Sequence, residues 1–219
     1  MAATVVTSPV SHYRMARCQD WLDAKRPAEE VLIIGATLGA ANELSRNLAK
    51  AKRASFGYHR LTFSQLASAL ARSALTAQAT VPLGPLGIQA VANRAIHKLS
   101  EAEGLGRYAS LTNGPGFARA IANVITELRL EQIEPDALRE AAPDLRRLLQ
   151  MYQHELEENG FTDWPGVLRA AASAATDTEF RHQLLGLPTL LLDVPLTTAS
   201  DIGLVRALSS RSPEILNRS

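Results

Sequence analysis

A glycine-containing turn after a hydrophobic strand is the part of this sequence closest to a phosphate-binding site. Residues 30–35 form a continuous apolar, β-branched run, which predicts a buried parallel strand. A turn from Gly35 through Thr37 to Gly39 follows, and we expect a helix from about Ala40. Backbone N–H groups at the start of such a helix point at an anion, and the helix dipole favours negative charge there.

The same turn lacks the side chains that nucleotide hydrolysis needs. A working phosphate loop reads G-x-x-x-x-G-K-[ST], in which the lysine reaches the β- and γ-phosphates and the hydroxyl binds Mg²⁺. With Gly39 as the second glycine, Ala40 stands at the lysine position and Ala41 at the hydroxyl position. We therefore expect no ATP hydrolysis, no cofactor and no bound metal. The simpler interpretation is that Gly35 and Gly39 only turn the chain.

The turn also fits a dinucleotide-binding fingerprint, as in short-chain dehydrogenases. Gly35, Gly39 and the small residue Ala41 would then approach a pyrophosphate. About 20 residues further on, where an acidic residue would bind the ribose, the sequence has Lys52 and Arg53 instead. No tyrosine is followed four residues later by the lysine that these enzymes use for proton transfer. A dinucleotide-dependent reductase therefore stays open only as an alternative.

Asp193 is the second candidate for chemistry. It follows an apolar run over residues 189–192, at the place where a Walker B carboxylate would orient Mg²⁺. The next residue is Val194, where helicases place a glutamate that activates water. Because aspartate is also common in the turn between a strand and a helix, a structural role is the simpler interpretation. The five histidines are scattered and share no metal-ligand spacing.

Composition limits the classes of protein to which the chain can belong. Its 219 residues are 46% hydrophobic, enough to bury a core, and only 5% aromatic, so the core is built mainly from aliphatic side chains. A net charge of +1 argues neither for nor against nucleic acid, whereas a strongly basic domain would have favoured DNA. One cysteine, Cys18, excludes a disulfide framework. No apolar run approaches the roughly 20 residues that span a bilayer, so we expect a cytoplasmic protein without membrane contact.

The order of the predicted elements indicates an α/β domain that is interrupted by helices. Short strands are predicted at residues 4–7, 30–35 and 59–63, and a Pro- and Gly-rich segment follows at 80–87. Amphipathic helical stripes then continue until the apolar run at 189–192. We predict one α/β domain from residues 1–80 and 185–219, with a helical subdomain inserted at 81–184. The strand that leads to Asp193 should lie beside the strand that ends at Gly35, in a mostly parallel sheet.

Several segments, in this order, resemble the AddB-type subunit of the AddAB helicase–nucleases, which process broken DNA ends for recombinational repair. No single motif decides the resemblance, and it covers nearly the whole chain. The similar segments are residues 31–48, 60–71, 114–129, 149–171 and 190–208.

This resemblance implies an architecture and a role. It implies a RecA-like (P-loop NTPase-like) fold, with the helical subdomain inserted between a degenerate phosphate loop at Gly35, Thr37, Gly39, Ala40 and Ala41 and a degenerate Walker B residue, Asp193. It also implies a non-catalytic scaffold whose partners are DNA and a motor subunit of AddA type. The family's nuclease and iron–sulfur residues have no counterpart here, so we expect a fragment or a shortened gene product. A purely structural interaction module is the remaining alternative.

Overall fold

The chain divides into two compact units, each with its own core. The computed structural model describes residues 2–6, 11–26, 28–52, 57–102, 104–112, 114 and 116–218. The first unit, here called the sheet unit, contains Met1–Ala71, Ala171–Thr197 and Ile202–Ser219. The second, here called the helical unit, contains Arg72–Ala170 and Thr198–Asp201. Arg53, near the position where a ribose-binding acid would stand, lies outside the described residues.

The sheet unit is built on a five-stranded sheet in which every neighbouring pair of strands is parallel. The order across the sheet is β1-β7-β6-β2-β3. Leu192 pairs with Gly35, which confirms the predicted neighbourhood of these two strands. The strands are β1 (Ala2–Val6), β2 (Val31–Gly35), β3 (Tyr58–Thr62), β6 (Thr189–Leu192) and β7 (Glu214–Arg218).

The direction in which the chain winds reverses between β2 and β6. From β2 the chain moves outward to β3, and from β6 it moves the opposite way to β7. Over these four strands the order is 2-1-3-4, as in doubly wound sheets of the flavodoxin-like type, and β1 adds beyond β7. Sheets of this kind hold their ligands outside the carboxyl ends of the strands, at such a switch point. Gly35 and Asp193 therefore mark the edge at which a ligand site is expected.

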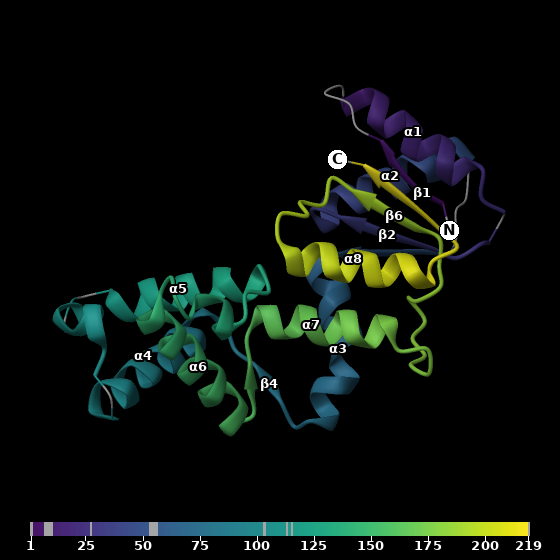
Figure 1. Cartoon of the computed structure of the whole chain (residues 1–219). Helices are drawn as coiled ribbons and strands as arrows, with labels where there is room; N and C mark the ends of the chain where they lie inside the picture. The colour runs from purple at the N-terminus through teal and green to yellow at the C-terminus, as the bar shows by residue number, and fades with distance from the viewer. Residues whose placement is uncertain are drawn as a thin grey trace. The chain divides into compact units, whose positions relative to one another are not determined.

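One core of the sheet unit lies between the sheet and the helices α1 (Ser11–Asp23) and α2 (Leu38–Lys52). Successive side chains along a strand point to opposite faces of the sheet. Val31 and Ile33 therefore lie in this core, while Leu32 and Ile34 lie on the other face. The helix α8 (Ala199–Arg211) crosses that other face in Figure 1. The core residues are Cys18, Leu22, Val31, Ile33, Ala41, Leu44, Leu48, Leu190, Leu192 and Leu216.

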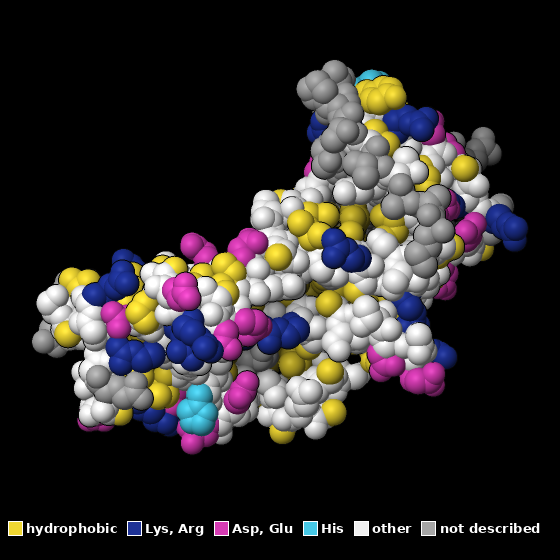
Figure 2. Space-filling view, in the orientation of Figure 1, with side chains coloured by type: hydrophobic (Ala, Val, Ile, Leu, Met, Phe, Trp, Pro, Cys, Tyr) yellow, Lys and Arg dark blue, Asp and Glu magenta, His cyan; other side chains and the backbone are white. Residues whose placement is uncertain are grey.

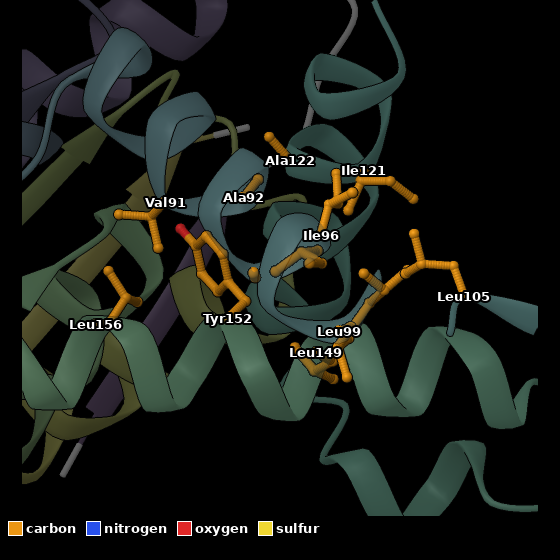
Figure 3. Packing of buried hydrophobic residues seen from close by; sticks show 13 residues of the cluster. Val91, Ala92, Ile96, Leu99, Leu105, Ile121, Ala122, Leu149, Tyr152 and Leu156 are labelled. Carbon is orange, nitrogen blue, oxygen red and sulfur yellow. The ribbon is translucent and has the colours of Figure 1, made fainter. Parts of the chain in front are cut away.

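The helical unit has a core of its own around Tyr152. Figure 3 shows the Tyr152 ring among Val91, Ala92 and Leu156, and all four side chains are buried. A pair of two-residue parallel strands, which the sequence did not predict, also lies in this unit.

The helical unit takes in most of the chain between β3 and β6, and the first and last helices of this stretch, α3 and α7, each contribute residues to both units. The elements are α3 (Phe63–Ala77), β4 (Val81–Pro82), α4 (Pro85–Ala102), η1 (Gly106–Leu111), α5 (Phe117–Leu130), η2 (Pro135–Leu138), α6 (Pro143–Glu158), β5 (Phe161–Thr162) and α7 (Trp164–Thr176).

Among the helices of the described residues, none combines the length and the apolar composition that a membrane span requires. The longest of them, α4, has 18 residues and includes Arg94, Lys98 and Glu101. Charged side chains at this density are costly in a bilayer core.

Asp144 in the first turn of α6 gives the helical unit a stability that depends on pH. Its carboxylate accepts a hydrogen bond from the backbone N–H of Arg107 at 3.0 Å and pairs with the Arg147 guanidinium at 2.7 Å. Both contacts lower the pKa of Asp144 below its ordinary value, and the hydrogen bond from the Arg107 N–H has the larger effect. A lowered pKa means that the stabilisation is present above the unfolded-state pKa, about 4, and is lost as pH falls through the folded-state pKa.

We therefore expect Asp144→Asn to be less stable than the native chain at neutral pH and to approach it in strong acid. Thermal unfolding of both proteins between neutral pH and about pH 2.5 would measure this, since that range extends below the unfolded-state pKa of about 4. The difference in midpoint temperature should be constant above the unfolded-state pKa and shrink below it. A difference that stays constant over the whole range would show that Asp144 contributes nothing through its charge.

Candidate functional site

The connection between β2 and α2 is shorter than a phosphate loop. The strand ends at Gly35 and the helix begins at Leu38, so only Ala36 and Thr37 lie between them. The helix was expected from about Ala40, and this start was wrong by two residues because Thr37 caps the helix earlier. The Thr37 hydroxyl accepts a hydrogen bond from the Ala40 N–H at 3.2 Å, which is the geometry of an N-cap.

Gly35 is required by close packing at this turn. A Cβ atom built on Gly35 would lie 2.6 Å from the Thr37 carbonyl oxygen and 3.3 Å from the Cβ of Ala41. Gly39 is different, because it lies inside the first turn of α2 and a Cβ there would meet only the Thr37 Oγ1 atom, at 3.7 Å. Gly35 thus allows the helix to approach the strand, whereas Gly39 has no comparable steric reason to be glycine.

The two alanines at the lysine and hydroxyl positions of a phosphate loop are directed toward the protein interior. Ala41 is fully buried in the core between the sheet and α2, and Ala40 is half-buried and packs against that core. A longer side chain at position 41 would displace core atoms rather than reach a ligand. Neither Ala40 nor Ala41 therefore offers this sheet edge a side chain that could hold phosphate or metal.

Asp193 lies at the same sheet edge, immediately after β6. Its backbone has φ of 51°, a left-handed conformation that aspartate tolerates better than most residues. The Ala36 N–H donates to the Leu192 carbonyl at 3.0 Å, so the β2–β6 ladder continues to the turn beside Asp193. The Asp193 carboxylate lies 3.6 Å from the Arg14 Nε atom of α1. An arginine from the protein therefore stands beside the carboxylate that would otherwise attract a cation.

The end of β3 does not offer a ribose-binding acid. Thr62 ends this strand, and its hydroxyl accepts a hydrogen bond from the Gln65 N–H at 3.2 Å. The Gln65 side chain in turn accepts one from the Thr62 N–H at 2.9 Å. This reciprocal pair is a capping box that starts α3. The position at which a dinucleotide fold places its carboxylate is thus used to begin a helix.

No cluster of metal-binding side chains occurs in the described residues. No group of three or more histidine, cysteine or carboxylate side chains there is arranged to hold a metal ion. His59 lies 3.2 Å from Glu30, while His97 and His154 each lie near a glutamate one helical turn away, at 3.5 and 3.7 Å. Cys18 is buried in the core of the sheet unit.

A positively charged hollow in the sheet unit was not predicted from the sequence. Arg46 of α2 and Arg60 of β3 line a hollow between these two elements. Arg46 lies in a helix close to Lys50, so in the sequence it looks like part of an ordinary solvated face. The alternation of side-chain directions along β3 could have indicated the hollow. This alternation places Arg60 on the same face of the sheet as Ile33, and α2 packs on that face.

Comparison with known proteins gives no relative for this chain: no family model matches it, and no curated protein matches it.

Proposed function

We propose that this chain is a non-catalytic, helicase-like scaffold module of an AddAB-type helicase–nuclease, acting in DNA-end processing for recombinational repair. The observation that supports the proposal is the switch point between β2 and β6. Its strand order is the one that places ligand sites at the carboxyl ends of parallel strands. However, Ala40 and Ala41 are directed toward the core, and Arg14 lies beside Asp193. A motor domain that keeps its sheet and loses its phosphate chemistry would have these features. The RecA-like assignment of the sheet unit is part of this proposal.

A buried polar network in the helical unit joins two of the segments in which the resemblance lies. Two of the similar segments, residues 114–129 and 149–171, are joined by a buried ion pair between Arg129 and Asp163. Tyr152, in the second segment, is fully buried beside this pair, with its hydroxyl 3.4 Å from the carboxylate. The spacing of these residues in the sequence thus serves one structural network. This supports a common architecture and assigns no catalytic role to these residues.

The basic side chains of the helical unit are mostly engaged with carboxylates. On the face seen in Figure 2, blue and magenta side chains are interspersed over this unit. Such a surface attracts DNA weakly, because its own carboxylates compete with the phosphates. We therefore place most of the DNA affinity of the assembly in the motor subunit. The pairs are Arg94 and Lys98 with Glu155, Arg139 and Arg146 with Asp136, and Arg107 and Arg147 with Asp144.

We expect the turn between β2 and α2 to bind neither ATP nor Mg²⁺-ATP. Loss of the cation and the metal ligand at a transferring phosphate removes several kcal/mol of electrostatic stabilisation. Titration of a fluorescent ATP analogue and thermal shift with Mg²⁺-ATP should give no saturable response that depends on Thr37 or Gly39. The variant Ala40→Lys should not restore binding, because Ala40 packs against the core. Saturable ATP binding that a change at Thr37 or Gly39 abolishes would contradict the prediction.

The proposed scaffold role is tested by assembly with the motor. The chain, mixed with the AddA-type motor subunit from the same organism, should co-elute with it in size-exclusion chromatography and raise its affinity for a DNA end. Separate elution at micromolar concentrations, with unchanged DNA binding by the motor, would reject the proposal. Fluorescence titration with NADPH tests the reductase alternative: micromolar affinity that Gly39→Ala abolishes would favour the reductase despite Thr62 at the end of β3.

A further inference from the structure

The hollow beside β3 lies between one face of α2 and one face of the strand and is open to solvent. Its volume is about 610 Å³, within the range of small-molecule sites, roughly 300–1,000 Å³. It is distinct from the switch-point edge, since neither Gly35, Thr37 nor Asp193 lines it. The lining residues are Asn42, Ser45, Arg46, Ala49, Gly57, Tyr58 and Arg60.

Two different periodicities bring these residues together. In α2, Asn42, Arg46 and Ala49 recur at i, i+4 and i+7, which places them on one face of the helix. In β3, Tyr58 and Arg60 are two residues apart and point to the same face of the sheet. Their partners in β2 are Val31 and Ile33, both in the core that α2 covers. The helix and the strand therefore present these side chains to a common space.

The described residues that line the hollow give it a positive charge. Among the described residues, the guanidinium groups of Arg46 and Arg60 have neither an ion pair nor a hydrogen bond, and the described lining includes no carboxylate. Both arginines are exposed, so their charged groups lose little hydration free energy in these positions. Asn42 and Tyr58 add neutral hydrogen-bond donors. Ser45 is buried, and its hydroxyl donates to the Ala41 carbonyl at 3.0 Å.

We propose that this hollow binds a phosphate group through Arg46 and Arg60. The planar guanidinium donates paired hydrogen bonds that match phosphate oxygens, and charge-assisted bonds of this kind are about twice as strong as neutral ones. The same chemistry is offered by a free phosphorylated metabolite and by a nucleic-acid backbone. The inference is independent of the proposed scaffold role, because the hollow exists in this chain with or without a bound motor.

Two probes distinguish the sources: inorganic pyrophosphate, followed by calorimetry, and a short labelled single-stranded oligonucleotide of mixed sequence, followed by anisotropy. Arg46→Gln and Arg60→Gln should each weaken the bound probe by about tenfold or more, since each removes a charge-assisted contact. For the oligonucleotide, the slope of log affinity against log salt should also fall by about 0.7 for each arginine removed. Arg206→Gln is the matched control, an exposed arginine on α8, across the sheet.

Pyrophosphate binding that both variants weaken identifies a free phosphorylated ligand, and oligonucleotide binding with the same pattern identifies a nucleic-acid backbone. The proposal is overturned if neither probe binds the native chain, or if the two variants bind as Arg206→Gln does. Circular dichroism confirms that the variants are folded. Because the motor takes no part in these titrations, their failure leaves the scaffold proposal to its own test.

Discussion

Asp163→Ala is expected to lower the free energy of unfolding by about 3–5 kcal/mol, because it leaves a buried arginine without its partner. Asp163 is fully buried and receives bonds from the Nε and Nη2 atoms of Arg129 at 2.7 and 3.0 Å. It also accepts a hydrogen bond from the Gly166 N–H at 3.0 Å and so caps α7. Burial first, and the negative charge of Asp163 second, raise the pKa of the neighbouring Tyr152.

A matched set of variants separates the charge from the cap. Asp163→Asn keeps a good capping residue, worth about 1 kcal/mol relative to alanine, and removes only the charge, so most of the loss should persist. Asp136→Asn is the surface control: Asp136 pairs with Arg139 at 2.9 Å but its side chain is 72% exposed, so little change is expected. Urea unfolding of the three variants, all changes at aspartates, measures the differences directly.

The double variant Arg129→Met/Asp163→Leu tests the cause. Because a buried ion pair is costly to desolvate, replacing both partners with apolar side chains should recover much of the stability lost in Asp163→Ala. If the double variant is no more stable than Asp163→Ala, the loss comes from packing and not from an unpaired charge. If Asp163→Asn is as stable as the native chain, the electrostatic explanation is wrong.

The parts of this fold that could be predicted from the sequence are those whose pattern is set by burial. The strand 31–35 is buried on both faces and therefore reads as a continuous apolar run, as does 189–192. The order of the predicted strands and helices along the chain also predicted that these two strands pair in parallel, and they do. In the helical unit, Ile121 and Ile125 are one helical turn apart and are both buried, whereas Val124 between them is exposed.

Other parts depend on contacts that no local pattern records. β7 lies between β1 and β6, yet only Ile215 and Leu216 of its five residues are apolar, so the short run did not predict a strand. The capping by Thr37 placed the start of α2 two residues earlier than the glycine pattern suggested. Arg60 comes to line the hollow only through the register that pairs it with Ile33. Spacing in the sequence places Tyr58 and Arg60 on one face of the strand, but it records neither the strand pairing nor the helix cap.

Gly35→Ala and Gly39→Ala should change stability in opposite directions, although both remove a glycine from the same predicted loop. A Cβ at position 35 would lie 2.6 Å from a backbone oxygen, so the strand or the helix must shift, at a cost of about 1–3 kcal/mol. A Cβ at position 39 makes ordinary contacts, and alanine in place of a helical glycine stabilises by up to about 1 kcal/mol.

The sign of the Gly39→Ala effect is what separates a structural turn from a ligand loop. A loop that cradles phosphate needs both glycines for the approach of the ligand, so it would lose ligand affinity on either change, whatever happened to stability. Thermal and urea unfolding of the two variants, with titrations of the ATP analogue and NADPH on the native chain and on both variants, measure both quantities. A Gly39→Ala variant that is destabilised as much as Gly35→Ala would contradict the structural explanation. A stabilised Gly39→Ala, in a chain that binds neither nucleotide, means that the turn between β2 and α2 serves only to pack the helix against the sheet.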